Sequence, residues 1–150
     1  MVPQAIGLGL VISLIFSETL GVTAGGMVVP GYIALMMDKP LTILITIVIA
    51  IAALLTLRML SNLMFIYGKR RFVIVILIGF IYGELCRRLL ILALPNFSAE
   101  LMVVGYIIPG LIANWMDRQG IVSTLCVMIV TAIFVRLLLI LLTGGKLILL

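Results

Sequence analysis

A glycine-proline break at residues 26–39, GMVVPGYIALMMDK, returns at residues 105–118 as GYIIPGLIANWMDR. Seven of the fourteen positions are identical, and three more are Val/Ile or Lys/Arg exchanges. Proline removes a backbone donor and clashes with the preceding turn, and glycine weakens a helix, so neither segment forms one uniform helix. The matched pair predicts two halves, residues about 1–71 and about 72–150, each ordered as span, broken segment, span.

Most of the chain is apolar. Of its 150 residues, 65% are hydrophobic and only 10% are charged, and the mean hydropathy is +1.48. Soluble domains are about 25% charged, and a chain of 16.3 kDa that folds in water cannot hide so much apolar surface. This composition excludes a soluble enzyme, a nucleic-acid-binding module and a disordered tail. It predicts an all-α integral membrane protein with a single membrane domain over residues 1–150.

Four stretches are predicted to span the membrane, since about 20 apolar residues cross the hydrocarbon core. They are residues 4–20, 41–67, 72–94 and about 121–142. The two broken segments between them either re-enter or cross, and irregular backbone at that depth must be covered by protein or line a cavity. Re-entrant segments would make the halves parallel, and crossing segments would make them inverted. Both alternatives stay open, with four to six membrane segments in total.

Five charged residues fall inside the predicted spans: Arg58, Glu84, Arg87, Arg88 and Arg136. A charge near the centre of a membrane helix costs at least about 2.5–3.5 kcal/mol. One interpretation pairs Glu84 with Arg87 or Arg88 on one helix face and lets the other two arginines extend to an interface. The other interpretation makes the four arginines a basic lining that receives a carboxylate-rich substrate.

The two Pro-Gly pairs also have two interpretations. They could allow close helix packing and a kink. Alternatively, each break frees a half-helix N-terminus near the middle of the membrane, whose N–H groups and dipole favour an anion. In that case Pro30, Gly31, Pro109 and Gly110 lie on the same substrate or polymer path as the four arginines.

Two polar groups are candidate docking sites for a soluble partner. One is the turn with Lys69, Arg70 and Arg71, the longest basic run of the chain. Cytoplasmic loops carry an excess of Lys and Arg, so this turn is predicted to face the cytoplasm. The other is the densest polar cluster of the second half, whose loop residues could equally form a solvated cap. Its members are Asn114, Asp117, Arg118 and Gln119.

The chain lacks several residue types and motifs that catalytic sites commonly use. It contains no His, and Cys86 and Cys126 lie far apart inside apolar runs, which excludes a His/Cys zinc site and a disulfide framework. A phosphate-binding loop of the Gly-Lys-Ser/Thr type does not occur in the sequence. We therefore expect no catalytic residue, no metal site and no cofactor in this chain.

Three motifs follow one another along the chain. The first couples Glu18 to AGGMVVPGYIAL at residues 24–35, the second is FIYGKRRF at residues 65–72, and the third is IIPGLIAN at residues 107–114 with RQG at residues 118–120. In order, spacing and total length they resemble the membrane subunit of poly-γ-glutamate synthase, the CapC/PgsC family. The resemblance covers essentially the whole chain.

The resemblance implies a multisubunit synthase in a bacterial cell membrane that builds and exports an anionic polymer of γ-linked glutamate, for a capsule or for release. A separate cytosolic ligase subunit would form the amide bond with ATP and a divalent metal ion. This chain would be a non-catalytic, multi-pass subunit that anchors the ligase and takes part in synthesis and export. A third subunit would lie on the outer side, and the chain could form a homo-oligomer; no nucleic-acid partner is implied.

Two other functions stay open from the residues alone. A stand-alone small transporter or channel for anionic solutes would also suit matched halves with broken segments. A pure scaffold would only recruit the ligase through the basic turn at residues 69–71. Neighbouring genes or a partner ligase would separate the synthase subunit from the transporter.

Overall fold

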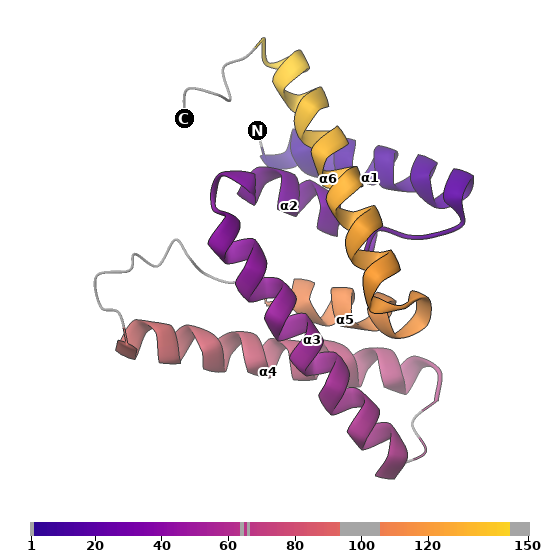
Figure 1. Ribbon diagram of the computed structural model, residues 1–150, viewed down its shortest axis with the longest axis vertical. Coiled ribbons are helices and arrows are strands. Elements are labelled where there is room, and N and C mark those ends of the chain that lie inside the picture. The colour runs from indigo at the N-terminus through magenta and orange to yellow at the C-terminus, as the bar shows by residue number, and fades with distance from the viewer. Residues whose placement is uncertain (1, 64, 66, 94–105, 145–150) are drawn as a thin grey trace.

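The computed structural model describes residues 2–63, 65, 67–93 and 106–144, and every regular element in these ranges is helical (Figure 1). The predicted all-α fold class is confirmed. The end of the span predicted at residues 72–94 and the start of the second broken segment lie outside the described residues. The elements are α1 (Val2–Leu20), α2 (Val29–Leu35), the 3-10 turn η1 (Met36–Asp38), α3 (Pro40–Leu63), α4 (Lys69–Ala93), α5 (Ile108–Gln119) and α6 (Ile121–Leu142).

Glycine and proline mark where the short helices start and stop. α2 begins at Val29 and α5 at Ile108, so each has proline in its first turn. Proline suits this position because its missing N–H would have no partner within the helix. α5 ends at Gln119, and the next residue, Gly120, has a φ of 93°, which lies in the left-handed region that favours glycine.

Two segments expected as turn or loop are helical. Residues 69–71 form the first turn of α4, and residues 114–119 form the last turns of α5. Both expectations about local structure are therefore wrong. Lys, Arg and Gln are good helix formers, so a helix can extend through a polar stretch beyond its apolar run.

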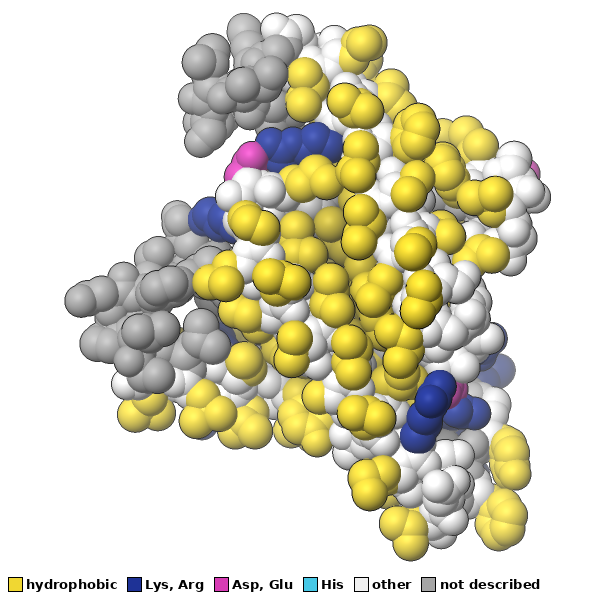
Figure 2. Space-filling view, in the orientation of Figure 1, with side chains coloured by type: hydrophobic (Ala, Val, Ile, Leu, Met, Phe, Trp, Pro, Cys, Tyr) yellow, Lys and Arg dark blue, Asp and Glu magenta, His cyan; other side chains and the backbone are white. Residues whose placement is uncertain are grey.

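Within the described ranges, three helices are long and apolar enough to cross a membrane: Pro3–Leu20, Pro40–Leu63 and Ile121–Leu142. α4 has 25 residues but carries basic residues in its first turn and three further charges in its second half. Figure 2 shows hydrophobic side chains spread over most of one face of the molecule, with acidic and basic side chains in a few small groups. Such an exterior suits lipid as the surrounding solvent.

The long apolar helix that ends each half packs on the other half. α3 packs against α4 and α5, and α6 packs against α1 and α2 (Figure 1). In Figure 1, α3 and α6 run in opposite directions, and so do α1 and α4. These directions favour the inverted over the parallel relation of the halves. The two-repeat organisation and the single domain over residues 1–150 stay predictions.

The main core lies where α3, α5 and α6 meet. Its largest fully buried side chains include Leu54 and Leu57 of α3, Ile112 and Met116 of α5, and Met128 of α6. The third helices of both halves therefore contribute to one core. Separating the halves would expose it.

Candidate functional site

The Pro-Gly elements are points of close backbone contact. A Cβ atom added at Gly9 would lie 2.7 Å from Gly31 Cα, and one added at Gly79 would lie 2.7 Å from Gly110 Cα. Real Cβ atoms do not approach other atoms so closely, so α1 meets α2, and α4 meets α5, with no side chain between the backbones. The same contact occurs in both halves.

This contact bears on the role of the breaks. Pro30 and Gly31 are buried in the first turn of α2, and Pro109 and Gly110 are buried in the first turn of α5. Because α1 and α4 cover these turns, the geometry supports the packing interpretation. A role of the four residues on a polymer path stays a prediction.

Arg136 on α6 binds Asp38 at the end of η1. Its Nη1 donates to Asp38 Oδ2 at 3.1 Å and to the carbonyl oxygen of Ala34 at 3.0 Å, and its Nη2 donates to Asp38 Oδ1 at 2.5 Å. The guanidinium binds the carboxylate in a bidentate manner, and only 16% of the Arg136 side chain is exposed. Hydrogen bonding to this guanidinium holds the pKa of Asp38 below its ordinary value.

Asp117 on α5 lies between two arginines. Arg71 Nη2 of α4 contacts Asp117 Oδ2, and Arg58 Nε of α3 lies 3.7 Å from Asp117 Oδ1. The Asp117 side chain is 12% exposed, that of Arg71 is 34% exposed and that of Arg58 is 54% exposed. We call Asp38 with Arg136 the first ion-pair cluster, and Asp117 with Arg58 and Arg71 the second.

The two clusters lie at opposite ends of the long apolar helices. Asp38 precedes α3 by two residues, whereas Arg58 lies near its other end, about 27 Å further along the helix. This separation is close to the thickness of the hydrocarbon core, about 30 Å. Each cluster joins a carboxylate of one half to an arginine of the other, Asp38 to Arg136 and Asp117 to Arg58.

The other two arginines of the predicted lining lie elsewhere. Arg88 Nε donates to Glu84 Oε1 at 3.1 Å, which is the pairing that the first interpretation expects. Arg87 Nη1 donates to the hydroxyl of Tyr106 at 2.5 Å. Arg87 follows Arg71 on α4 by about 24 Å of helix. The described structure therefore does not bring Arg58, Arg87, Arg88 and Arg136 into one lining, and their role on a polymer path stays a prediction.

The candidate docking residues are partly brought together. Arg71 binds Asp117, which places the first turn of α4 beside the end of α5, while Lys69 and Arg70 are exposed. The guanidinium carbon of Arg118 lies 5.9 Å from the centre of the Trp115 ring.

Two of the docking residues contact the interior of the chain. Asn114 is only 6% exposed, so it is not available to a partner. Gln119 Nε2 donates to Thr23 Oγ1 and ties α5 to the segment between α1 and α2. The expectation that residues 114–119 form an exposed polar cluster is therefore wrong at Asn114, because that face of α5 is buried against other helices.

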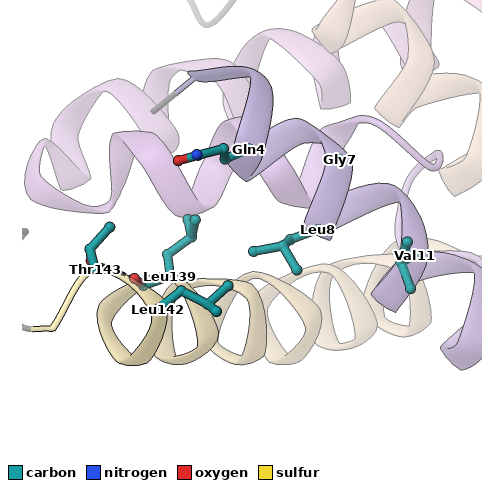
Figure 3. A pocket seen from close by; sticks show the side chains of 7 residues that line it. All are labelled: Gln4, Gly7, Leu8, Val11, Leu139, Leu142 and Thr143. Carbon is teal, nitrogen blue, oxygen red and sulfur yellow. Dashed lines mark hydrogen bonds between the residues drawn. The ribbon is translucent and has the colours of Figure 1, made fainter.

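A cavity of about 650 Å³ lies between the start of α1 and the end of α6 (Figure 3). Its walls are mainly apolar, and none of the side chains that line it is ionisable. Among the described residues, no group of three His, Cys, Asp or Glu side chains could hold a metal ion. The lining residues are Gln4, Gly7, Leu8, Val11, Leu139, Leu142 and Thr143.

The crossed ion pairs are what reasoning from the sequence missed. A signal was present: Asp38 and Asp117 match at a shift of 79 residues, and Arg58 and Arg136 match at a shift of 78. These matched residues predict ion pairs between the halves only once it is known that α3 and α6 each pack on the other half. The local pattern does not contain that information.

Comparison with known proteins identifies relatives along most of the chain. The profile of the capsule biosynthesis CapC family matches residues 8–125. The PGA biosynthesis protein CapC of Bacillus subtilis (strain 168) is 35% identical over 121 residues, 80% of each chain, and the capsule biosynthesis protein CapC of Bacillus anthracis is 36% identical over 126 residues, 81% of each chain. No solved structure matches. With this coverage and identity, the chain belongs to the CapC family of capsule biosynthesis proteins.

Proposed function

We propose that this chain is the multi-pass membrane subunit of a bacterial poly-γ-glutamate synthase, where it anchors the ATP-dependent ligase and takes part in export of the polymer. ATP and a divalent metal ion belong to the ligase, and a further subunit lies on the outer side. The family membership and the three apolar helices support this proposal.

The observation that carries the proposal is a concentration of positive charge at one end of the molecule. Five of the ten basic residues gather around Asp117, where α4 begins and α5 ends. We call this group the basic end. Its members are Arg58, Lys69, Arg70, Arg71 and Arg118.

The basic end suits the cytoplasmic face. Membrane proteins keep an excess of Lys and Arg on the cytoplasmic side, within reach of soluble proteins. Lys69 and Arg70 are exposed there and no acidic side chain of the described residues pairs with them. An acidic surface of a ligase would find two free cations at this place, and its attraction would weaken with salt.

Export fits the same orientation. Each γ-linked glutamate keeps one free carboxylate, so the product is a polyanion that starts in the cytoplasm. A membrane potential that is negative inside favours its outward movement by about 2.3 kcal/mol per charge per 100 mV. The field and polymerisation together could drive export without an ATPase in this chain.

The test uses charge reversal at the two exposed cations. The double variant Lys69→Glu, Arg70→Glu is expressed in a strain that makes the polymer, and the membranes are solubilised in mild detergent. We expect the wild type to co-purify a soluble protein that joins glutamate with ATP, and the double variant to lose it while its own membrane level is unchanged. Arg88→Glu, an exposed arginine on the same helix, is the matched control and should retain the ligase.

Two results would contradict the proposal. A wild-type chain that purifies without any ligase would favour the stand-alone transporter, and liposome flux with glutamate and its oligomers would then be measured. A double variant that retains the ligase at physiological salt would remove the docking role from residues 69 and 70.

A further inference from the structure

Arg58 and Arg71 converge on a single carboxylate and leave donors unused. A guanidinium has five N–H donors. Arg58 reaches Asp117 only at 3.7 Å and is 54% exposed, and no hydrogen bond from it to a described residue is formed. Arg71 contacts Asp117 with Nη2, but its buried Nε has no hydrogen-bond partner among the described residues. The second ion-pair cluster therefore has spare binding capacity for an acceptor.

The numbers of arginines and carboxylates in the two clusters also indicate spare binding capacity at the second. In the first ion-pair cluster one arginine meets one carboxylate through both Nη atoms and also binds a backbone carbonyl, so its polar groups are largely used. In the second, two arginines share Asp117, which leaves one positive charge in excess. Lys69, Arg70 and Arg118 are exposed, lie within two residues of Arg71 or Asp117 in the sequence, and add three more positive charges. Such a site attracts anions.

We propose that Arg58 and Arg71 form a binding site for a carboxylate carried by another molecule, and that Asp117 occupies this site in its absence. The long contact makes exchange at the exposed Arg58 inexpensive, because a loose, hydrated ion pair contributes little stability. The contact of Asp117 with Arg71 is lost in the exchange, and the incoming carboxylate has to replace it. An incoming carboxylate accepts from the exposed Arg58 first and then takes the place of Asp117 at Nη2 of Arg71.

The ligand class follows from the proposed function, on which this inference rests. The site lies at the basic end, where a ligase docked on Lys69 and Arg70 would release its product. A chain of γ-linked glutamate presents carboxylates in series, and the first can exchange with Asp117 while the next meets Arg118. Several weak contacts on one chain add up to useful affinity. The site would thus hold the growing polymer at the entrance to the membrane domain.

The test measures binding of a short, fluorescently labelled oligomer of γ-linked glutamate to the full chain in detergent, by fluorescence anisotropy at a fixed salt concentration. Arg58→Gln should weaken binding about tenfold, as expected for one charge-assisted contact. Asp117→Asn should strengthen it about threefold to tenfold, because the internal competitor is gone. Arg58 is half exposed, so its variant is expected to fold normally and can overturn the proposal by itself.

Asp38→Asn is the matched control. It raises the net charge by the same one unit as Asp117→Asn and also frees an arginine, but at the first ion-pair cluster. If both variants strengthen binding equally, general electrostatic attraction explains the effect and the proposal is wrong. An unchanged affinity in Arg58→Gln or in Asp117→Asn would overturn it as well.

Failure of this inference can be told apart from failure of the proposed function. Arg58→Gln should leave ligase co-purification intact, since it changes neither Lys69 nor Arg70. A wild-type chain that co-purifies the ligase yet binds no oligomer would overturn the carboxylate site and leave the anchoring role in place. A chain that binds the oligomer but never co-purifies a ligase would overturn the anchoring role and keep the site. An α-linked glutamate oligomer, tested in parallel, shows whether the site distinguishes the polymer from an acidic peptide.

Discussion

The two ion-pair clusters join the same residue types across the same pair of halves, yet their geometry differs. At the first, Arg136 is 16% exposed and forms a fork on Asp38 with a further bond to the chain. At the second, Arg58 is 54% exposed and lies 3.7 Å from Asp117, which Arg71 also contacts. In the first cluster the arginine is the more buried partner, the carboxylate is exposed, and the two charges balance. In the second cluster the carboxylate is the more buried partner, Arg58 is exposed, and positive charge is in excess.

The difference shows how matched halves can acquire unequal tasks. The backbone contacts between Gly9 and Gly31 and between Gly79 and Gly110 are alike, so the helices of both halves meet in the same way. What differs is the added arginine at position 71 and the basic residues beside it. The packing is shared by the two halves, whereas the excess of positive charge is not, and the proposed contacts with other molecules rest on that excess.

The first prediction tests the likeness of the halves. Gly31→Val and Gly110→Val should each destabilise the protein by about 2–4 kcal/mol, because the new side chain meets the backbone of α1 or α4. The measurement is the thermal unfolding midpoint in detergent. Gly7→Ala, at a position with nothing within 4 Å, is the control and should not lower the midpoint. A large decrease in the unfolding midpoint for only one of the two valine variants would contradict equal packing in the two halves.

The second prediction tests the unequal ion pairs. Arg136→Gln should cost about 1–3 kcal/mol, since it leaves the carbonyl of Ala34 and the Asp38 carboxylate without a donor. Arg58→Gln should cost less than about 1 kcal/mol, because Asp117 keeps Arg71. Unfolding midpoints of the two variants, measured side by side, check this order. Equal decreases in the unfolding midpoint would mean that Arg58 and Arg136 contribute equally to stability.

The third prediction concerns acid. Hydrogen bonding to Arg136 holds the pKa of Asp38 below its ordinary value of 3.8, so the carboxylate contributes stability above pH 3.8 and loses that contribution as the pH falls through the lower folded-state value. Solvent screens this carboxylate, which is 59% exposed, so the effect is small. The gap in unfolding midpoint between wild type and Asp38→Asn should narrow below pH 3.8. If the difference in midpoint between wild type and Asp38→Asn does not change with pH, the charge of Asp38 does not contribute to stability.

Much of the helical layout could be predicted from the sequence. Apolar runs and glycine-proline breaks gave the long helices and the starts of α2 and α5, since both signals are local. The limits of the helices were predicted less well. The span was predicted to begin at residue 72, whereas α4 begins at Lys69, within the basic run. The burial of Asn114 and the pairs Asp38–Arg136 and Asp117–Arg58 could not be predicted. They depend on which helices meet, and residues 98 positions apart carry no local sign of contact.

We propose that the two ion-pair clusters lie at opposite faces of the membrane, with the basic end in the cytoplasm. The most direct test is labelling of single cysteines in intact cells with a thiol reagent that does not cross membranes, in a background with Cys86→Ala and Cys126→Ala. We expect that Lys39→Cys, beside Asp38, is labelled from outside, and that Arg70→Cys is labelled only after the cells are opened. Labelling of both from the same side would contradict opposite faces for the two clusters.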